Sequence, residues 1–395
     1  MFDQQTIKDL EFSKIRNLLV NFCVEETAKN KLSKIQPFAA QEKANKELLI
    51  ISEFKFIKEE QHSGFPRLEF EELGKELKTL RIKGTTLEVE SVVKIYDASV
   101  LVNEMLTFFS KREEEFFTFK EEFNNVYFTK EIIDPIEKVL DKRLKVKDDA
   151  SKLLSEIRQQ IKSTKRQINR NFDRALKKYQ GKGYLGDTNE SFFNGRRVLS
   201  VISSYKRTVD GKQFGASKSG HLSYIEPEEN AALNSGLDKL EDEERLEVLR
   251  ILKVLTAQIQ SNFILIKEYQ YLLVRLDFLQ AKTKLAILLD ANYPKFSEES
   301  SVDLIDAVHP LLYLNNQKEK KKTLAQSIKM DKFSRMLVIS GPNAGGKSIT
   351  LKTIGLLQLM YQCGLLIPAN EYSTMGWFNS ILTDIGDNQS IENEL

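Results

Sequence analysis

Gly341-Pro342-Asn343-Ala344-Gly345-Gly346-Lys347-Ser348 is the stretch of sequence that decides the fold of the last hundred residues. It fits the phosphate-binding pattern G-x-x-x-x-G-K-[ST] at every position. The preceding residues 336–340 form a short apolar run with the length and content of a buried parallel strand. Residues 349–360 continue with a helical pattern. A strand, a glycine-rich loop and a helix in this order predict a P-loop nucleotide-binding domain.

The chemistry of a bound nucleoside triphosphate explains the residue types in this loop. The glycines let backbone N–H groups turn toward the β-phosphate, at the positive end of the following helix. Lys347 can reach the β- and γ-phosphates, and the Ser348 hydroxyl can bind Mg²⁺, so these two are the candidate catalytic residues. We expect ATP and Mg²⁺ as cofactors, with Ser348 as the residue that contacts the Mg²⁺ bound to ATP. The expected binding residues are Gly341, Pro342, Asn343, Ala344, Gly345, Gly346, Lys347, Ser348 and Ile349.

Hydrolysis requires a second, acidic strand that holds the Mg²⁺ and positions the attacking water. After Ser348 a single apolar run, residues 381–384, leads to an aspartate, and it is short and polar. We therefore expect the catalytic acid beyond Leu395, and no hydrolysis by these 395 residues alone.

Composition narrows the class of protein. The chain has 41% hydrophobic and 29% charged residues, and 59 Lys and Arg against 57 Asp and Glu give a net charge of +2. These values are typical of a globular protein and say nothing about its partners. Cys23 and Cys363 are too far apart in sequence for a disulfide framework. No signal peptide and no run of about 18 apolar residues is found, so we expect a cytoplasmic protein without a membrane span.

Apolar periodicity predicts a helical protein with one long arm. Residues 6–128 have a broken helical pattern, which predicts a scaffold of several helices. Residues 136–179 have a narrow apolar seam, and residues 228–291 have a matching stripe. Two long helical stretches on either side of a short insert predict an antiparallel arm. The seams comprise Leu154, Ile157, Ile161, Ile168, Phe172 and Leu176, then Leu252, Leu255, Ile259, Phe263, Ile266, Leu273 and Leu276.

The insert at the arm's tip has the pattern of β-structure. Residues 197–205 are rich in Val, Ile, Leu and Ser, and Asp210-Gly211 is a hairpin signal. A second extended run, residues 219–225, is closed by Glu226-Pro227.

Basic charge is concentrated on the distal arm and the insert. Residues 158–218 contain fifteen Lys and Arg against four Asp and Glu, an excess of eleven in a chain whose net charge is +2. This is the electrostatic pattern of a surface that contacts phosphates, although most charged runs are only solvated helix faces. We expect backbone and shape recognition of DNA rather than reading of base sequence. The candidates are Arg166, Arg170, Arg196, Arg197, Lys206, Arg207, Lys212 and Lys218.

Three segments resemble the MutS family. Residues 340–348, Ser-Gly-Pro-Asn-Ala-Gly-Gly-Lys-Ser, closely resemble its T-G-P-N-x-G-G-K-[ST] loop. Val308-His309-Pro310-Leu311-Leu312 is similar to the H-P-L-L segment that leads into its nucleotide domain. Residues 383–391, Thr-Asp-Ile-Gly-Asp-Asn-Gln-Ser-Ile, resemble its D-I-G-D-x-Q-S-I stretch.

Within that family the likeness is to the bacterial paralogues often called MutS-two. Residues 10–15, Leu-Glu-Phe-Ser-Lys-Ile, are similar to the L-E-F-x-K-[IV] opening of that branch. Residues 219–227 resemble its S-G-x-T-x-[FY]-[IV]-E-P signature, with Leu222 in place of the threonine. The helical scaffold begins almost at once, where mismatch-reading members carry a further domain, so direct mismatch recognition is not expected.

The resemblance implies a multidomain α plus α/β architecture that ends before the Walker B strand. The expected parts are a helical core at 1–135, an ascending arm helix at 136–185, a β-rich clamp insert at 186–227, a returning arm helix and core at 228–295, and a truncated P-loop NTPase domain of the ABC type at 296–395.

The resemblance also implies a function and leaves an alternative open. The first hypothesis is an ATPase that, as a full-length homodimer, grips branched or recombining DNA and changes its grip with ATP. The alternative is a ribosome-associated ATPase that contacts ribosomal RNA on stalled or collided ribosomes. A coiled-coil ATPase of the chromosome-maintenance type would have much longer heptad arms and a P-loop near the N-terminus, and the sequence has neither.

Overall fold

The structure is a computed structural model of the chain, and it describes residues 4–60, 64–112, 114–340 and 346–384. The chain divides into two compact units, which are described separately. Unit 1 comprises Met1–Lys78, Lys94–Lys130 and Asn262–Leu395, and unit 2 comprises Thr79–Val93 and Glu131–Ser261.

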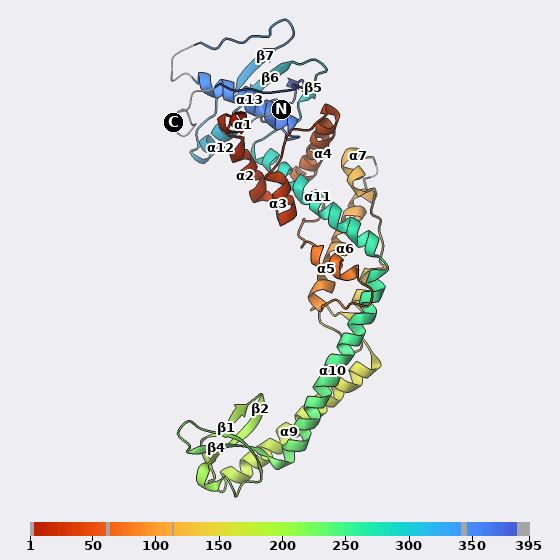
Figure 1. Cartoon of the computed structure of the whole chain (residues 1–395), viewed down its shortest axis with the longest axis vertical. Coiled ribbons are helices and arrows are strands. Elements are labelled where there is room, and N and C mark those ends of the chain that lie inside the picture. Colours follow the sequence, from red (N-terminus) through yellow and green to blue (C-terminus); the bar gives the residue numbers. More distant parts are fainter. Residues whose placement is uncertain (1–3, 61–63, 113, 341–345, 385–395) are drawn as a thin grey trace. The chain divides into compact units, whose positions relative to one another are not determined.

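Unit 1 is mainly helical, and its central helix is α11 (Phe263–Leu288), which packs against α2, α3 and α4 (Figure 1). Apolar residues occur on most faces of α11, which is the pattern of a helix surrounded by protein. Buried Asp277 of α11 accepts hydrogen bonds from the backbone N–H groups of Val24 and Glu25, both at 2.9 Å, and so satisfies the N-terminus of α3. The other helices are α1 (Gln4–Asp9), α2 (Phe12–Phe22), α3 (Glu26–Leu32), α4 (Gln41–Glu59), α7 (Phe117–Lys120), η1 (Glu121–Phe123), α12 (Pro310–Lys318) and α13 (Lys347–Gln362), with α5 (Gly74–Leu80) and α6 (Val89–Ser110) divided between the units.

A small mixed sheet belongs to the same unit. Its strands are β5 (Lys295–Phe296), β6 (Val302–Ala307), β7 (Gln326–Met330) and β8 (Thr374–Met375), in the order β5-β8-β6-β7. β6 is antiparallel to β7 and β8, and β5 is parallel to β8. Side chains of α13 fix the segment after β8, because the amide of Gln358 donates to the carbonyl of Gly376 at 2.9 Å and that of Gln362 to the carbonyl of Phe378 at 2.7 Å.

The prediction of a strand at residues 336–340 is wrong. These residues form no strand, and Met336 and Val338 are 90% and 88% exposed. A parallel strand is held by hydrogen bonds to its neighbours, and no strand in the described ranges pairs with this segment. Apolar composition makes a segment suitable for a buried strand, but a partner must be present for the strand to form.

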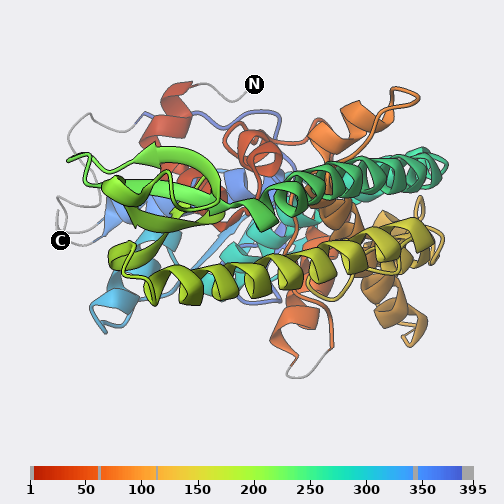
Figure 2. The same ribbon diagram turned by 90° about the horizontal axis from the view of Figure 1, so that it is seen from below.

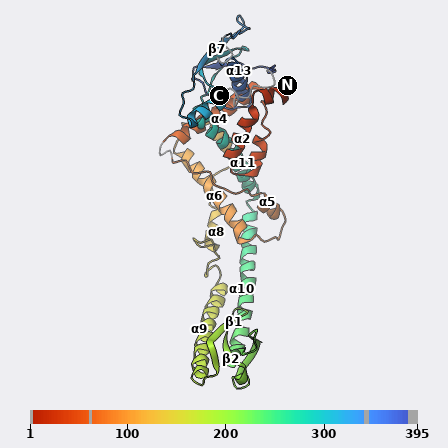
Figure 3. The same ribbon diagram turned by 90° about the vertical axis from the view of Figure 1, so that its left-hand side faces the viewer.

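Unit 2 contains the predicted antiparallel pair of long helices, α9 (Lys152–Gln180) and α10 (Glu228–Gln260), which lie side by side in Figures 1 and 3. Arg158 pairs with Glu244 and Lys165 with Glu241, at 2.7 Å in each case, which fixes the antiparallel register. The predicted seam of α9 is buried from Leu154 to Phe172.

The ascending helix begins at Lys152, so the prediction of a helix from residue 136 is wrong. The short helix α8 (Ile133–Val139) ends first, and a loop follows in which the Asp141 carboxylate accepts from the N–H groups of Arg143 and Lys145. The Ser151 hydroxyl then accepts from the N–H of Leu154 at 3.0 Å and caps α9. Short polar side chains that bond to nearby backbone thus end one helix and start the next.

The returning stretch is also divided, because α10 ends at Gln260 and α11 begins at Phe263. At the break the Ser261 hydroxyl donates to the carbonyl of Gln258 at 2.6 Å, in competition with the helical ladder. No single helix in the part of the chain that the structure describes is long and apolar enough to cross a membrane, and α10 with α11 reaches that length and composition only as an interrupted pair.

The insert of unit 2 is a four-stranded antiparallel sheet at one end of α9 and α10, the end nearest the viewer in Figure 2. Its strands are β1 (Leu185–Phe193), β2 (Arg196–Ile202), β3 (Gly211–Ala216) and β4 (Leu222–Pro227), in the order β1-β2-β4-β3, with η2 (Ser203–Tyr205) after β2. The sheet covers one end of α9 through a buried cluster of Phe172, Ala175, Tyr179, Leu199, Val201, Val209 and Ile225.

The predicted hairpin signal at Asp210-Gly211 does not mark a tight turn between neighbouring strands. Gly211 opens β3, which pairs with β4, while β2 pairs with β1 and β4. A Cβ at Gly211 would lie 2.1 Å from the carbonyl oxygen of Glu226, so the close approach of β4 requires glycine. The tight hairpin is instead at Asn194-Gly195, between β1 and β2, where both residues have positive φ.

Candidate nucleotide and nucleic-acid sites

Lys347 and Ser348 are the first two residues of α13, where the sequence places the start of the phosphate-binding helix. Gly346 precedes them with φ of 78°, a left-handed conformation that glycine adopts without strain. Thr350 closes the first turn, with its N–H and its hydroxyl donating to the Gly346 carbonyl at 2.9 and 3.0 Å. A sixteen-residue helix has a partial positive charge at this end, and with the lysine it favours a bound phosphate.

Part of the predicted loop lies outside the described residues, namely Gly341, Pro342, Asn343, Ala344 and Gly345. Ile349 is half-buried one position after Ser348. The segment 381–384 lies along α1, because the Thr383 hydroxyl donates to Asp9 Oδ2 at 2.6 Å and the Thr6 hydroxyl to the Ile381 carbonyl at 3.2 Å. It does not form a strand, so it does not supply the acidic strand that hydrolysis needs.

His309, in the segment that resembles the H-P-L-L motif, is a buried helix cap. Its Nδ1 accepts from the N–H of Leu312 at 3.4 Å at the start of α12, and its Nε2 has no hydrogen-bond partner among the described residues. Burial, with the nearby ammonium groups of Lys352 and Lys14, lowers the pKa of His309 to about 3. Its burial and its capping hydrogen bond give His309 a role in local structure at the start of α12.

The far end of α13 is attached to the helical core by buried charges. Lys282 of α11 is fully buried, and its Nζ donates to Glu47 of α4 at 2.7 Å and to the carbonyls of Cys363 and Gly364, each at 3.2 Å. Arg275 also pairs with Glu47. Burial opposes ionisation of Glu47, but the Lys282 ammonium and the Arg275 guanidinium outweigh it and lower the pKa of Glu47 to about 2. Ion pairs therefore connect α4 with α11, and hydrogen bonds from Lys282 connect both to the end of α13 within unit 1.

Two of the predicted DNA-contacting residues in unit 2 have structural roles. Arg196 pairs with the buried carboxylate of Glu226 at 3.3 Å and with Asp238 of α10. Glu226 also accepts from the amide of Asn234, so this group joins the sheet to α10. This role of Glu226 was not predicted from the sequence. An acidic residue between Ile225 and Pro227, at the end of a predicted strand, was the sequence feature that could have indicated it.

Arg197 is held just as firmly. Its guanidinium pairs with Glu190 at 2.6 Å and with Asp173 at 3.1 Å, and it lies 4.2 Å from the centre of the Phe172 ring. Both arginines are already matched by carboxylates, so neither presents an unbalanced charge to a phosphate.

The other six predicted residues are exposed: Arg166, Arg170, Lys206, Arg207, Lys212 and Lys218. Among the described residues no ion pair is found for them, and the Lys212 ammonium lies 5.5 Å from the Phe214 ring. The Ser203 hydroxyl donates to the Gly220 carbonyl at 2.6 Å, which places the turn carrying Lys206 and Arg207 beside the turn carrying Lys218. We call these three the tip cations. Lys212 is at the opposite end of its strand pair, and Arg166 and Arg170 are on α9.

The excess of positive charge on the folded arm is smaller than the count along residues 158–218 indicates, because α10 brings acidic residues next to α9. The acidic residues of α10 lie opposite α9, where Glu244 and Glu241 pair with Arg158 and Lys165. A count along residues 158–218 cannot include them, because they belong to the returning helix. Within the described part of the arm, exposed cations without an ion pair consequently include the tip cations, Lys182 and Lys212 of the insert, and Arg166 and Arg170 of α9.

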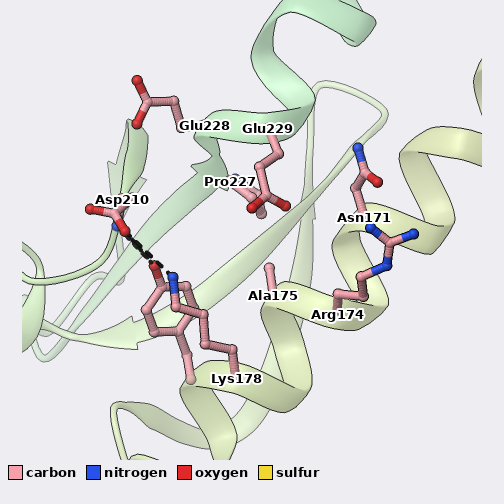
Figure 4. Close-up of a pocket in the computed structure, with 9 residues that line it drawn as sticks. Asn171, Arg174, Ala175, Lys178, Asp210, Pro227, Glu228 and Glu229 are labelled. Carbon is pink, nitrogen blue, oxygen red and sulfur yellow. Dashed lines mark hydrogen bonds and ion pairs between the residues drawn. The ribbon is translucent and has the colours of Figure 1, made fainter.

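A groove of about 530 Å³ lies between α9 and the start of α10 (Figure 4). Arg174 and Lys178 project from α9, and Glu228 and Glu229 project from the first turn of α10. Asp210 accepts from the Tyr179 hydroxyl at 3.1 Å and lies 3.6 Å from the Lys178 ammonium. Three carboxylates against two cations make this groove a poor site for a phosphate.

Comparison with known proteins agrees with these features. Residues 337–395 match MutS domain V. The chain is 30% identical over its whole length to Endonuclease MutS2 of Aquifex aeolicus, of which it covers 50%, and 31% identical over its whole length to Endonuclease MutS2 of Enterococcus faecalis, of which it covers 49%. It is 36% identical over 63% of its length to Endonuclease MutS2 of Staphylococcus carnosus, covering 31% of that protein. The chain thus spans about half the length of the curated relatives over which it aligns from end to end. Because the matches to these relatives extend over the helical core, the arm and the phosphate loop alike, they support the MutS2 branch of the MutS family for this chain.

Proposed function

We propose that this chain acts in an ATP-dependent DNA-binding protein of the MutS type. The observation that carries the proposal is that the chain has two separate groups of residues that favour phosphate binding, one in each unit. In unit 1, Lys347 and Ser348 open a helix after a complete phosphate-loop sequence. In unit 2, the tip cations Lys206, Arg207 and Lys218 are exposed without carboxylate partners among the described residues.

For the nucleotide, the proposal assigns ATP and Mg²⁺ to the loop of residues 341–349. The start of α13 favours the negative phosphates, Lys347 neutralises the β- and γ-phosphates, and Ser348 contributes a hydroxyl to Mg²⁺. Hydrolysis would belong to the full-length protein, acting as a homodimer, with its catalytic acid outside the described residues.

For the nucleic acid, the proposal assigns the DNA backbone to the arm of unit 2. Arginine and lysine side chains that contact phosphates fix position without reading sequence, which suits branched or recombining DNA. The tip cations, with Arg166, Arg170 and Lys212, are the proposed contacts. Arg196 and Arg197 are proposed to act indirectly, by holding the sheet that presents those cations.

A crossed mutational experiment tests both halves. Binding of a fluorescent ATP analogue with Mg²⁺, and of four-way-junction and linear duplex DNA over a salt series, would be measured for the 395-residue chain. Lys347→Ala is expected to abolish nucleotide binding and leave DNA affinity unchanged. Lys206→Ala with Arg207→Ala is expected to weaken DNA binding and to reduce the slope of log affinity against log salt by about 1 for each phosphate that the side chains no longer neutralise, while nucleotide binding stays unchanged.

Either half can fail separately. If Lys347→Ala still binds the nucleotide, the phosphate loop is not the site. If the chain binds no DNA even at low salt but sediments with ribosomes at moderate salt, ribosomal RNA replaces DNA as the partner. Loss of both activities in one variant, with a changed circular dichroism spectrum, would identify an unfolded protein rather than a damaged site.

A further inference from the structure

The tip of unit 2 carries a column of three tyrosine rings that the proposed function does not use. Tyr179, at the end of α9, stacks on Tyr184 with ring centres 6.3 Å apart and planes 25° apart. Tyr184 stacks on Tyr205 of η2 with centres 4.6 Å apart and planes 18° apart. The column therefore runs from the buried cluster of the sheet toward its surface, since Tyr179 is 3% exposed and Tyr205 is 39% exposed.

The backbone around each ring holds the column in place. The hydroxyl of Tyr179 donates to Asp210, and the N–H of Asp210 donates back to that hydroxyl, both at 3.1 Å. The carbonyl of Tyr184 accepts from the N–H of Ile202 at 2.9 Å, which ties this ring to β2. The carbonyl of Tyr205 accepts from the N–H of Thr208 at 2.9 Å, within the turn that carries Lys206 and Arg207. A ring held in this way loses little conformational freedom when a ligand stacks on it.

Positive charge lies beside the middle ring of the column and follows its exposed ring in sequence. The ammonium of Lys182 lies 5.9 Å from the centre of the Tyr184 ring. Lys206 and Arg207 directly follow Tyr205 and are exposed. Asp210, the acidic residue in contact with the column, is engaged by the Tyr179 hydroxyl and lies 3.6 Å from the Lys178 ammonium.

We propose that Tyr205 is a stacking platform for an unpaired DNA base, whose flanking phosphates contact Lys182, Lys206 and Arg207. An aromatic face bordered by cations matches a nucleotide, which has a planar base and an adjacent negative charge. A fully paired duplex offers only phosphates to this surface, whereas a bulge, a gap or a branch point offers a base as well. The platform would thus give the arm its preference for irregular DNA. This inference deepens the proposed function and rests on it.

The test uses the 395-residue chain and a DNA duplex with one unpaired 2-aminopurine, a base whose fluorescence falls on stacking. The control DNA is the same duplex with the 2-aminopurine paired. For the bulged duplex, Tyr205→Ala and Tyr205→Leu are expected to remove the quenching and to raise the Kd roughly fivefold to a hundredfold. Tyr205→Phe should retain both, and Tyr271→Ala, which removes an exposed tyrosine of unit 1, should behave as the unsubstituted chain. The Kd for the paired duplex should change less than about twofold in all four variants.

Unchanged quenching and affinity in Tyr205→Ala would overturn the platform and leave the proposed DNA binding intact. Absence of binding to both duplexes by the unsubstituted chain would overturn the proposed function and the platform together. An RNA duplex with the same bulge, bound more tightly than the DNA and through Tyr205, would overturn the assignment to DNA.

Discussion

The two units use charge in opposite ways. In unit 1, Lys282 and Glu47 are buried together, and the ammonium group also bonds the two carbonyls that follow α13. In unit 2, the pairs between α9 and α10 are partly exposed, as for Lys165 and Glu241. Buried pairs cannot exchange partners without leaving a charge in an apolar surrounding, whereas exposed pairs contribute little stability and can be replaced by phosphates. The buried Lys282–Glu47 pair of unit 1 therefore maintains structure, whereas the exposed cations of unit 2 that have no ion pair among the described residues are the ones proposed to contact phosphates.

The largest expected effect comes from breaking the buried pair. Lys282→Met keeps the length of the side chain but leaves Glu47 without its ammonium partner, which is expected to lower the free energy of unfolding by about 3–5 kcal/mol. Urea unfolding followed by circular dichroism measures it. The matched control, Lys267→Met, removes an exposed lysine of the same helix and should change stability by less than about 0.5 kcal/mol. Equal effects of the two substitutions would contradict a structural role for the buried pair of unit 1.

Acid should weaken unit 1 through the same carboxylate. Because the folded-state pKa of Glu47 is about 2 and its ordinary value is 4.5, its contribution is complete above about pH 4.5 and is lost as the pH falls toward 2. The advantage of the unsubstituted chain over Glu47→Gln is expected to be on the order of 3 kcal/mol at pH 6 and to shrink through this range. Urea unfolding at pH 6, 5, 4 and 3 tests this. A difference that does not vary with pH would mean that Glu47 acts through packing alone.

A smaller loss of stability is expected in unit 2 when the partly buried Arg196–Glu226 pair is broken. Arg196→Ala leaves buried Glu226 with only the Asn234 amide, and should destabilise unit 2 by about 1–3 kcal/mol. Hydrogen exchange of the β2 and β4 amides would locate the loss. Lys218→Ala, which removes an exposed lysine of the turn between β3 and β4, should leave the exchange rates unchanged. If Arg196→Ala lowers DNA affinity with no change in exchange, then Arg196 contacts DNA directly, as its position in the sequence first indicated.

Sequence periodicity predicted the arm because a long apolar seam has one simple solution, burial against a second helix. It could not place the helix ends, which depend on local bonds such as those of Asp141, Ser151 and Ser261. The hairpin at Asn194-Gly195 was within reach of sequence reasoning, because this dipeptide is the strongest short signal for such a turn.

The candidate sites were predictable to different degrees. The phosphate loop has a fixed spacing, so Lys347 and Ser348 could be placed at a helix start from sequence alone. The tip could not be resolved in the same way, because whether an arginine contacts solvent or a carboxylate depends on residues distant in sequence. Arg196 illustrates this, since its partner Asp238 is on the returning helix.

The division of the chain has a consequence for the order of synthesis. Unit 1 is assembled from three separate segments, and its central helix α11 follows the whole of α9, the sheet and α10. On the ribosome, α2, α3 and α4 are therefore synthesised well before the helix that packs against them, because α4 ends at Glu59 and α11 begins only at Phe263. Unit 2 is nearly continuous and can fold during that interval. The nascent chain thus carries an incomplete apolar core for much of its translation, a state in which chaperones that shield such surfaces would have the most to do.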